Sequence, residues 1–311
     1  MDVSVLDLGS HSFQLLYARS SRADRVERLH KDIEFVELTN FLSPLGSINK
    51  EGFAAGIRGV QLLLQRAPDS AHKRPLIAIA TSAIREASNG SDFLVALEQA
   101  TGVAARVISG DDEARFAYSG AASEFDGRAV RLAVVDLGGG STELAWGTGR
   151  QLVHAVSVRL GVMSLVERLA RMPNTANMAL DQLAVFVRRT LEPVVAAAEQ
   201  EPPAVLVFAS GVARVIQRLA VSYEVATPEA PITARALRAL IPLLLDATPD
   251  ELQARGVPPQ RVRTAGPTAI VLDVVCELFE KEEFIVARGG LREGAVLGAR
   301  KLPSQAWPAQ R

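Results

Sequence analysis

Hydrophobic and polar positions along the first 125 residues alternate between the two-residue period of strands and the longer period of helices. Around 50–66, apolar residues recur at helical spacing and form one face of a helix. Short apolar runs bounded by turn residues predict strands on either side of it. The predicted elements are, in order, strands at 2–8 and 12–18, a helix at 50–66, a strand at 76–80, a helix near 91–100, a strand at 103–108 and a helix near 111–120.

The rest of the chain repeats this alternation, and prolines divide its later part into separate helices. The predicted elements are strands at 131–136, 142–147 and 151–157, helices at about 161–170 and 178–199, a strand at 204–209, a helix from 212, a helix at 266–279, a strand at 283–287 and a helix at 290–302. Strands that alternate with helices in this way predict the α/β class, with both faces of each sheet covered.

One phrase occurs twice in the chain, at 5–15 and at 134–144. In each copy an apolar run leads to an Asp, then to a small-residue turn with a hydroxyl, and then to a second apolar run. This pattern predicts a hairpin with a carboxylate at its base and a turn bare enough for an anion to approach its backbone. The repeat indicates two related domains that each present a phosphate loop to a shared cleft. A pair of tight turns in an ordinary α/β protein is the alternative.

A charged stretch around Gly127 marks the expected boundary between these domains. We expect a first domain at 1–125 and a second at 126–297, with a final helix at about 298–311 packed back on the first. At 311 residues, the chain is long enough for two domains with separate cores.

Composition narrows the class of protein. The charges nearly cancel, with 34 basic and 35 acidic residues, so a polyanionic substrate would need a local basic patch. The single cysteine, Cys276, lies in an apolar run and is expected to be a buried thiol. With no second cysteine to form an internal disulfide, with no secretory leader and with no apolar run of membrane-spanning length, the chain fits a cytoplasmic protein.

The second copy of the repeat carries the stronger chemical signal. Its glycines, Gly138 to Gly140, expose consecutive backbone N–H groups, and Ser141 adds a hydroxyl, which together suit a phosphate. Asp136 and Glu143 lie at the two ends of this turn. Two carboxylates would repel a phosphate unless a hard cation bridges them, and magnesium is the natural candidate. A solvated strand residue is the alternative reading of Glu143.

Two further turns follow predicted strands, which is where α/β proteins place ligands. After the strand at 76–80, Arg85 can bind a phosphate through two N–H groups. After the strand at 204–209, Ser210 and Gly211 form a turn suited to a phosphate or a nucleotide, or else a plain crossover.

Three acids, Asp111, Asp112 and Glu113, begin the helix near 111–120. Acidic side chains favour helix N-termini through the helix dipole, so this position needs no catalytic explanation. Sequence chemistry alone therefore does not show which of the three, if any, takes part in a reaction.

Taken together, these blocks resemble the exopolyphosphatase and guanosine pentaphosphate phosphatase family of the actin-like superfamily. The resemblance runs in order through the first phosphate loop and five later blocks: TSAIREA at 81–87, SGDDEARF at 109–116, VVDLGGGSTEL at 134–144, VFASGVAR at 207–214 and GGLREG at 289–294. It implies two domains of related actin-like, or ribonuclease-H-like, fold around a central cleft, in the short two-domain form.

The resemblance also implies a role for individual residues. Glu113 matches the general base that activates a water, with Arg85 beside it in the catalytic set. Asp136 and Glu143 match the magnesium ligands. The residues expected to hold the substrate phosphates are Asp7, Gly9, Ser10, His11, Gly138, Gly139, Gly140, Ser141, Ser210 and Gly211.

Two positions depart from the family pattern. His11 stands where the family usually has Asn after the first Gly-Ser. A neutral imidazole still donates one hydrogen bond, so phosphate binding can survive with a different pH dependence. The block at 157–163 is also looser than its usual version, which bears on contacts between the domains.

The function expected from these features is magnesium-dependent release of orthophosphate from the end of inorganic polyphosphate. Hydrolysis of guanosine pentaphosphate is the alternative within the same chemistry, and Arg214, Arg261, Arg263 and Arg292 are candidates for residues that separate the two. An actin-like small-molecule kinase and a catalytically inactive nucleotide sensor are alternatives of other classes. No nucleic-acid or membrane partner is expected, and a homodimer is expected from the family alone.

Overall fold

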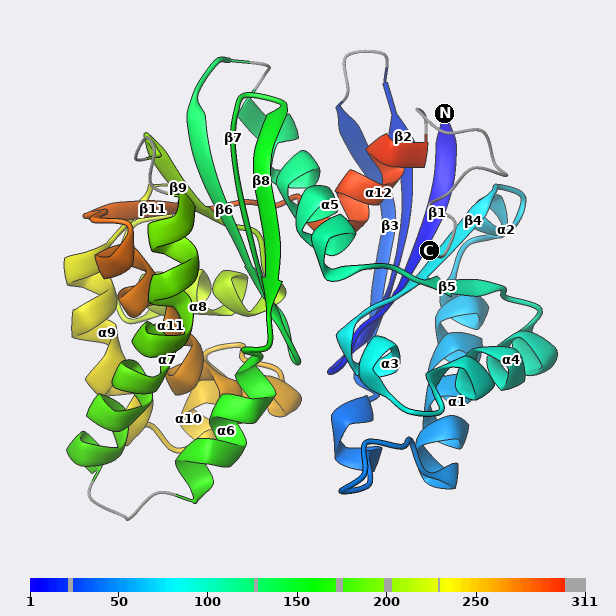
Figure 1. The fold of residues 1–311 in the computed structure, drawn as a ribbon, viewed down its shortest axis with the longest axis horizontal. Helices are drawn as coiled ribbons and strands as arrows, with labels where there is room; N and C mark the ends of the chain where they lie inside the picture. Colours follow the sequence, from blue (N-terminus) through cyan, green and yellow to red (C-terminus); the bar gives the residue numbers. More distant parts are fainter. Residues whose placement is uncertain (22–24, 126–127, 172–175, 199–202, 229, 300–311) are drawn as a thin grey trace. The chain divides into compact units, whose positions relative to one another are not determined.

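The first apolar run forms β1 (Asp2–Leu8), which turns back antiparallel into β2 (Phe13–Ser20). The computed structural model describes residues 1–21, 25–125, 128–171, 176–198, 203–228 and 230–299. It divides into unit 1, Met1–Asp126 with Gly289–Arg311, and unit 2, Gly127–Arg288. Each unit is built on a β-sheet of its own (Figure 1).

The sheet of unit 1 has the strand order β3-β2-β1-β4-β5. Its first three strands are antiparallel neighbours, with β3 at Val26–Glu34 on one edge. The strands β4 (Leu76–Ala80) and β5 (Ala105–Val107) continue the sheet in parallel with β1. The carboxyl ends of β1 and β4 therefore lie next to each other.

Helices cover both faces of this sheet, because residues along β1 alternate between two cores. Leu6 and Leu8 pack with α1 (Lys50–Arg66) and α4 (Gly90–Thr101), whereas Val3 and Val5 pack with the described part of the last helix, α12 (Leu291–Ala299). The remaining elements of unit 1 are short helices and α5: η1 (Leu38–Phe41), α2 (Asp69–His72), α3 (Ser82–Glu86), α5 (Gly110–Ala122) and η2 (Ser123–Phe125).

The sheet of unit 2 has the order β10-β11-β9-β6-β7-β8. Three antiparallel strands open it, and two later strands join in parallel with β6. The strands are β6 (Arg131–Leu137), β7 (Thr142–Thr148), β8 (Gln151–Val158), β9 (Val205–Phe208), β10 (Ile232–Thr233) and β11 (Glu283–Val286).

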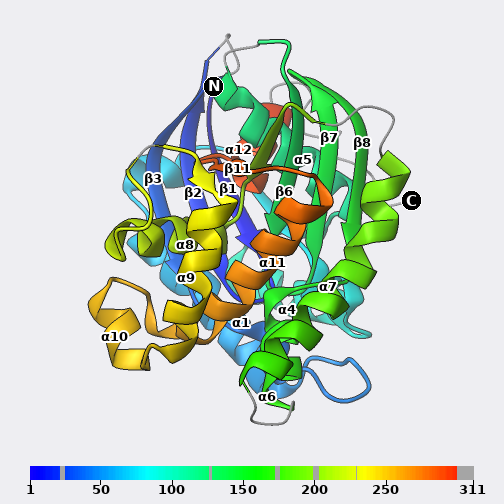
Figure 2. The same cartoon turned by 90° about the vertical axis from the view of Figure 1, so that its left-hand side faces the viewer.

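One large hydrophobic core holds unit 2 together. At its centre lies α11 (Ala265–Leu278), which is apolar on almost every side. The helices α7 (Ala176–Ala198) and α9 (Ala234–Asp246) pack against it (Figure 2). Cys276 is fully buried in this core, and burial raises the pKa of its thiol to about 12, so it is an inert structural residue. The other helices are α6 (Val162–Ala170), α8 (Gly211–Ser222), α10 (Pro249–Ala254) and η3 (Pro259–Thr264).

Five of the six strands in the sheet of unit 2 repeat the topology of the unit 1 sheet, and β10 adds an antiparallel strand beside β11. In each, a hairpin and a third antiparallel strand are followed by two parallel strands on the far side of the first strand. This repetition confirms the predicted α/β class. It also shows that the similarity between the two units includes strands beyond the repeated sequence at 5–15 and 134–144. No helix within the described residues is both long and apolar enough to cross a membrane.

Besides short elements that were not predicted, such as α3 and β10, two larger differences separate the structure from the sequence-based expectations. Strand β3 was not predicted, because its sequence alternates poorly and carries several charges, as suits a sheet edge. The second change of unit falls between Arg288 and Gly289 rather than at 297, because α12 as a whole packs in unit 1. The helix expected at about 298–311 lies almost entirely outside the described residues.

Backbone contact between α5 and α12 explains this packing (Figure 1). A Cβ atom at Gly294 would lie 1.9 Å from the carbonyl oxygen of Phe116, and one at Gly120 would lie 2.0 Å from that of Gly290. Buried Glu293 adds a polar anchor, since its Oε1 accepts from Arg28 Nε at 2.6 Å and its Oε2 from the Gly290 N–H at 3.0 Å. Burial alone would raise the pKa of Glu293, but the charges of Arg292 and Arg28 outweigh it and hold that pKa below its ordinary value.

We predict that Gly294→Ala destabilises the protein by about 1–3 kcal/mol, because α12 must move away from α5 to admit the new methyl group. Chemical denaturation followed by circular dichroism measures the effect. Gly298→Ala is the matched control, since the nearest atom to its added Cβ, at 3.1 Å, belongs to the movable Phe116 ring. Equal losses for the two variants would contradict the backbone contact as the cause.

Candidate functional site

The turn between β1 and β2 is closed by a hydrogen bond from the Gly9 N–H to the carbonyl oxygen of Ser12, at 3.2 Å. A Cβ atom at residue 9 would lie 2.8 Å from that oxygen, so the turn requires glycine. Asp7 lies two residues before Gly9, opposite Gln14, and is buried. The predicted first loop is thus a tight, buried turn with a carboxylate at its base.

Ser10 and His11, at the tip of this turn, are both buried. Ser10 Oγ lies 3.1 Å from Ser82 Oγ and accepts a hydrogen bond from the Ala83 N–H at 3.2 Å, which ties the turn to the start of α3. The imidazole of His11 lies edge-on to Phe35, with ring centres 5.4 Å apart. The backbone oxygen of His11 accepts a hydrogen bond from the N–H of Glu37, whose φ of 49° lies in the left-handed region.

The structure separates the three acids at the start of α5. Glu113 is buried, and its Oε2 accepts a hydrogen bond from Arg85 Nη1 at 2.9 Å. Asp112 instead accepts from the hydroxyl of the N-cap residue Ser109, and Asp111 is exposed. The acid in contact with Arg85 is therefore the one that the family resemblance selects.

Arg85 joins two strand ends. Its Nη1 also donates to the backbone oxygen of Ile108 at 3.1 Å, directly after β5, while its own helix follows β4. No described residue accepts a hydrogen bond from its Nε or Nη2. Arg85 can thus hold Glu113 with one nitrogen and bind an anion with the other two.

The corresponding turn of unit 2 is closed in the same way, by a bond from the Gly138 N–H to the Ser141 oxygen at 2.9 Å. The carbonyls of Gly138 and Gly139 accept from Val162 and Met163, in the first turn of α6. Within the described part of unit 2, nothing accepts from the amides of Gly139, Gly140 or Ser141. Their N–H groups form a suitable nest for phosphate oxygens.

Asp136 and Glu143 face each other across the β6–β7 pair, in direct register. Residues opposite each other in an antiparallel pair share one face of the sheet, so both carboxylates lie at the base of the glycine turn. Glu143 is buried, and its Oε1 accepts from Ser157 Oγ at 2.7 Å. The described residues hold no group of three or more His, Cys, Asp or Glu side chains that could cage a metal. Magnesium is commonly held by one or two protein carboxylates together with water and phosphate oxygens, and the pair Asp136 and Glu143 fits such a set.

The fourth predicted turn begins α8. Ser210 Oγ accepts from the Ala213 N–H at 3.0 Å and so caps the helix, which supports the crossover reading for this hydroxyl. The guanidinium of Arg261, a buried residue, lies against Gly211, since a Cβ there would be 2.9 Å from its Nη2. The start of α8 therefore has a positive group beside it.

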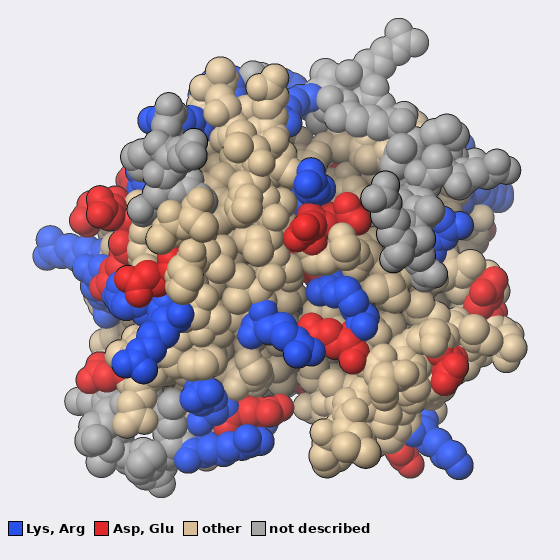
Figure 3. Space-filling model, viewed as in Figure 1, with Lys and Arg blue, Asp and Glu red and all other residues tan. Residues whose placement is uncertain are grey.

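The remaining arginines are placed differently from one another. Arg214 Nη1 donates to the backbone oxygen of Ala287 at 3.1 Å and braces the ends of β9 and β11. Arg263 is exposed in unit 2, and Arg292 is buried in unit 1. On the face drawn in Figure 3, Lys and Arg lie among Asp and Glu, without a continuous basic field over the described residues.

A sequence model of the Ppx/GppA phosphatase family matches residues 18–302. The chain belongs to this family. Among solved structures it is similar to an exopolyphosphatase from Cytophaga hutchinsonii, with a TM-score of 0.83 and 20% identity over 95% of this chain and 96% of that one. A Ppx/GppA family member from Aquifex aeolicus gives a TM-score of 0.78 and 23% identity over 97% and 98%.

A more distant likeness, to nucleoside triphosphate hydrolases from Neospora caninum, has a TM-score of 0.54 and 11% identity over 96% of this chain and 92% of that one. At these identities the structural likenesses establish the fold, which is that of two actin-like α/β domains. The family assignment rests on the sequence match and agrees with the motif order from TSAIREA to GGLREG.

Sequence reasoning missed two hydroxyls that contact predicted site residues. Ser82 lies inside the TSAIREA block, and its position directly after a buried strand was a usable signal. Ser157 lies on β8, and only strand pairing brings it opposite Glu143.

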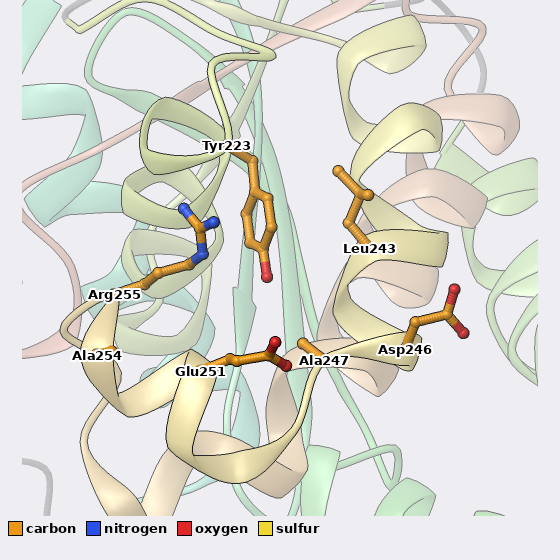
Figure 4. A pocket seen from close by; sticks show the side chains of 7 residues that line it. All are labelled: Tyr223, Leu243, Asp246, Ala247, Glu251, Ala254 and Arg255. Atoms are coloured by element: carbon orange, nitrogen blue, oxygen red, sulfur yellow. The ribbon is translucent and has the colours of Figure 1, made fainter.

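A separate pocket of about 400 Å³ lies in unit 2, beside the ends of α8 and α9 and against α10 (Figure 4). None of the predicted site residues lines it; the lining consists of Tyr223, Leu243, Asp246, Ala247, Glu251, Ala254 and Arg255. Arg255 stacks 3.8 Å from the centre of the Tyr223 ring and donates to Ser222, and Glu251 accepts from the Thr248 N–H. These bonds fasten α10 to α8 and to its own N-cap.

We predict that Gly161→Ala weakens binding of orthophosphate at the second turn, because its Cβ would lie 2.1 Å from the Gly139 oxygen and displace the turn. Calorimetric titration with orthophosphate measures the loss. Gly266→Ala in the same unit is the control, since its closest neighbour is the flexible end of Leu245 at 3.0 Å. Unchanged affinity in a folded Gly161→Ala protein would contradict phosphate binding by this turn.

Proposed function

We propose that this protein is a hydrolase that releases orthophosphate from the terminal phosphoanhydride of inorganic polyphosphate. Membership of the Ppx/GppA phosphatase family supports hydrolysis of phosphoanhydrides, and the similar Cytophaga hutchinsonii protein is an exopolyphosphatase. The observation that carries the proposal is the buried Glu113 carboxylate held at 2.9 Å by Arg85.

The proposed step is attack of a water oxygen on the terminal phosphorus, in line with the bond that joins it to the next phosphate. Glu113 takes the proton of the attacking water as the new P–O bond forms, and the bridging P–O bond breaks with its electron pair on the shortened chain. Arg85 orients Glu113 through Nη1 and offers Nε and Nη2 to the phosphate oxygens. The amides of Gly139, Gly140 and Ser141 offer further donors for the same kind of charge.

Asp136 and Glu143 are the proposed magnesium ligands. Magnesium supplies charge neutralisation on phosphate oxygens when it is bound. The opposed register of the two carboxylates supports this role, because each would otherwise repel a polyanion at the base of the turn.

A phosphate-release assay tests the proposal directly. We expect orthophosphate from long polyphosphate with magnesium present, little after chelation by EDTA, and recovery when magnesium is restored. Short polyphosphate and guanosine pentaphosphate complete the panel. If orthophosphate is released from guanosine pentaphosphate alone, guanosine pentaphosphate and not polyphosphate is the substrate. If ATP yields a phosphorylated small molecule, the protein is a kinase and not a hydrolase.

Replacing the proposed base gives a sharper test. Glu113→Gln keeps the size of the side chain but cannot accept the proton, so kcat falls by about 100- to 10,000-fold while the protein stays folded. Asp111→Asn, an exposed acid on the same helical turn, is the matched control and keeps the wild-type rate. Equal rates for wild type and Glu113→Gln on polyphosphate would remove Glu113 from the mechanism.

A further inference from the structure

Two buried hydroxyl groups, on Ser10 and Ser82, lie side by side where the first turn meets α3. Their Oγ atoms are 3.1 Å apart, and only 5% of Ser10 and 3% of Ser82 is exposed. Ser10 Oγ also accepts a hydrogen bond from the Ala83 N–H at 3.2 Å. The residue that the family resemblance assigns to phosphate binding is thus surrounded by groups from a second segment.

The two hydroxyl groups have one O–H proton more than the protein acceptors around them can bind. A serine hydroxyl donates one hydrogen bond and accepts up to two. Among the described residues, the Ser82 hydroxyl has Ser10 as its single partner. If Ser10 donates to Ser82, the Ser82 proton has no protein acceptor; if Ser82 donates to Ser10, the Ser10 proton has none. A buried donor without an acceptor is costly, so the arrangement suits an anion that supplies one.

We propose that Ser82 is a positioning residue that donates its proton to Ser10 and thereby directs the Ser10 O–H toward a phosphate oxygen of the substrate. The Ala83 N–H and the Ser82 O–H then occupy both acceptor positions of Ser10, so the Ser10 proton points away from these two donors. A bond from O–H to an anionic oxygen is stronger than one between two hydroxyls, and a chain of hydroxyls strengthens it further. The identity of the anion rests on the proposed function.

The same contacts tie the first turn to the helix that carries Arg85. The Thr81 N–H donates to the Leu8 oxygen at 3.3 Å, and the Arg85 N–H donates to the Thr81 oxygen at 2.9 Å. The hydroxyl of Ser10 and the guanidinium of Arg85 therefore belong to one hydrogen-bonded assembly. Ser82 lies at the point where this assembly meets the turn.

A double-mutant cycle tests the inference. Ser82→Ala should lower kcat/KM on polyphosphate by about 3- to 30-fold, the range for loss of support to a charge-assisted hydrogen bond. In a Ser10→Ala background the same change should have no further effect, because Ser82 acts only through Ser10. Ser82→Thr, which keeps the hydroxyl, should retain most of the wild-type value. Unfolding midpoints of all variants are measured alongside.

Ser4→Ala is the matched control, a buried serine on β1 whose hydroxyl donates to the Ala71 oxygen at 3.4 Å. It should leave kcat/KM unchanged in both backgrounds. Wild-type kcat/KM in Ser82→Ala would overturn the inference. A loss of equal size with and without Ser10 would also overturn it, because that result indicates a purely structural role.

Calorimetric titration with orthophosphate separates this inference from the proposed function. If the wild-type protein hydrolyses nothing but binds orthophosphate, and the affinities follow the same non-additive cycle, then the positioning role stands and the hydrolase proposal fails. If polyphosphate is hydrolysed and Ser82→Ala changes neither rate nor affinity, the positioning role alone fails. Absence of both hydrolysis and binding in the wild-type protein overturns both.

Discussion

A single backbone hydrogen bond, from a glycine N–H to the carbonyl oxygen three residues later, closes the first hairpin of each unit. It measures 3.2 Å at Gly9 and 2.9 Å at Gly138. Because the turn is so short, it sets the register of the two strands, and the Asp two residues before the glycine must face a defined partner. In each unit, the predicted phosphate-binding groups of the hairpin are held by this turn.

The two turns differ in what surrounds that bond. In unit 1, hydroxyl and imidazole groups occupy the tip, and a second segment, α3, braces it through Ser82 and Ala83. In unit 2, bare glycine amides occupy the tip, α6 binds the turn carbonyls, and a second carboxylate, Glu143, faces Asp136. The two turns thus carry different groups, which we propose to be donors for phosphate oxygens in both units and oxygen ligands for a cation in unit 2.

Much of this could be predicted from the chain itself. Apolar periodicity located most strands and helices to within a few residues, and the repeated phrase identified both turns. The predictions failed at the edge strand β3, whose charged residues hide the alternation that marks a strand. They also failed where two helices pack through direct backbone contact. The assignment of α12 to unit 1 depends on Gly294 meeting the Phe116 carbonyl, a contact that no periodicity encodes.

By itself the sequence determined which residue types stand at the turns, since glycine, hydroxyl and carboxylate patterns act through local backbone geometry. Tertiary structure decided which of those groups meet. Asp111, Asp112 and Glu113 are equivalent as acids at a helix start, and only the neighbouring end of β4 brings Arg85 to Glu113. Ser82 likewise gains its partner from a strand pairing more than seventy residues apart in sequence. Short segments of sequence therefore determine which chemical groups each turn presents, whereas long-range packing determines which of these groups contact one another.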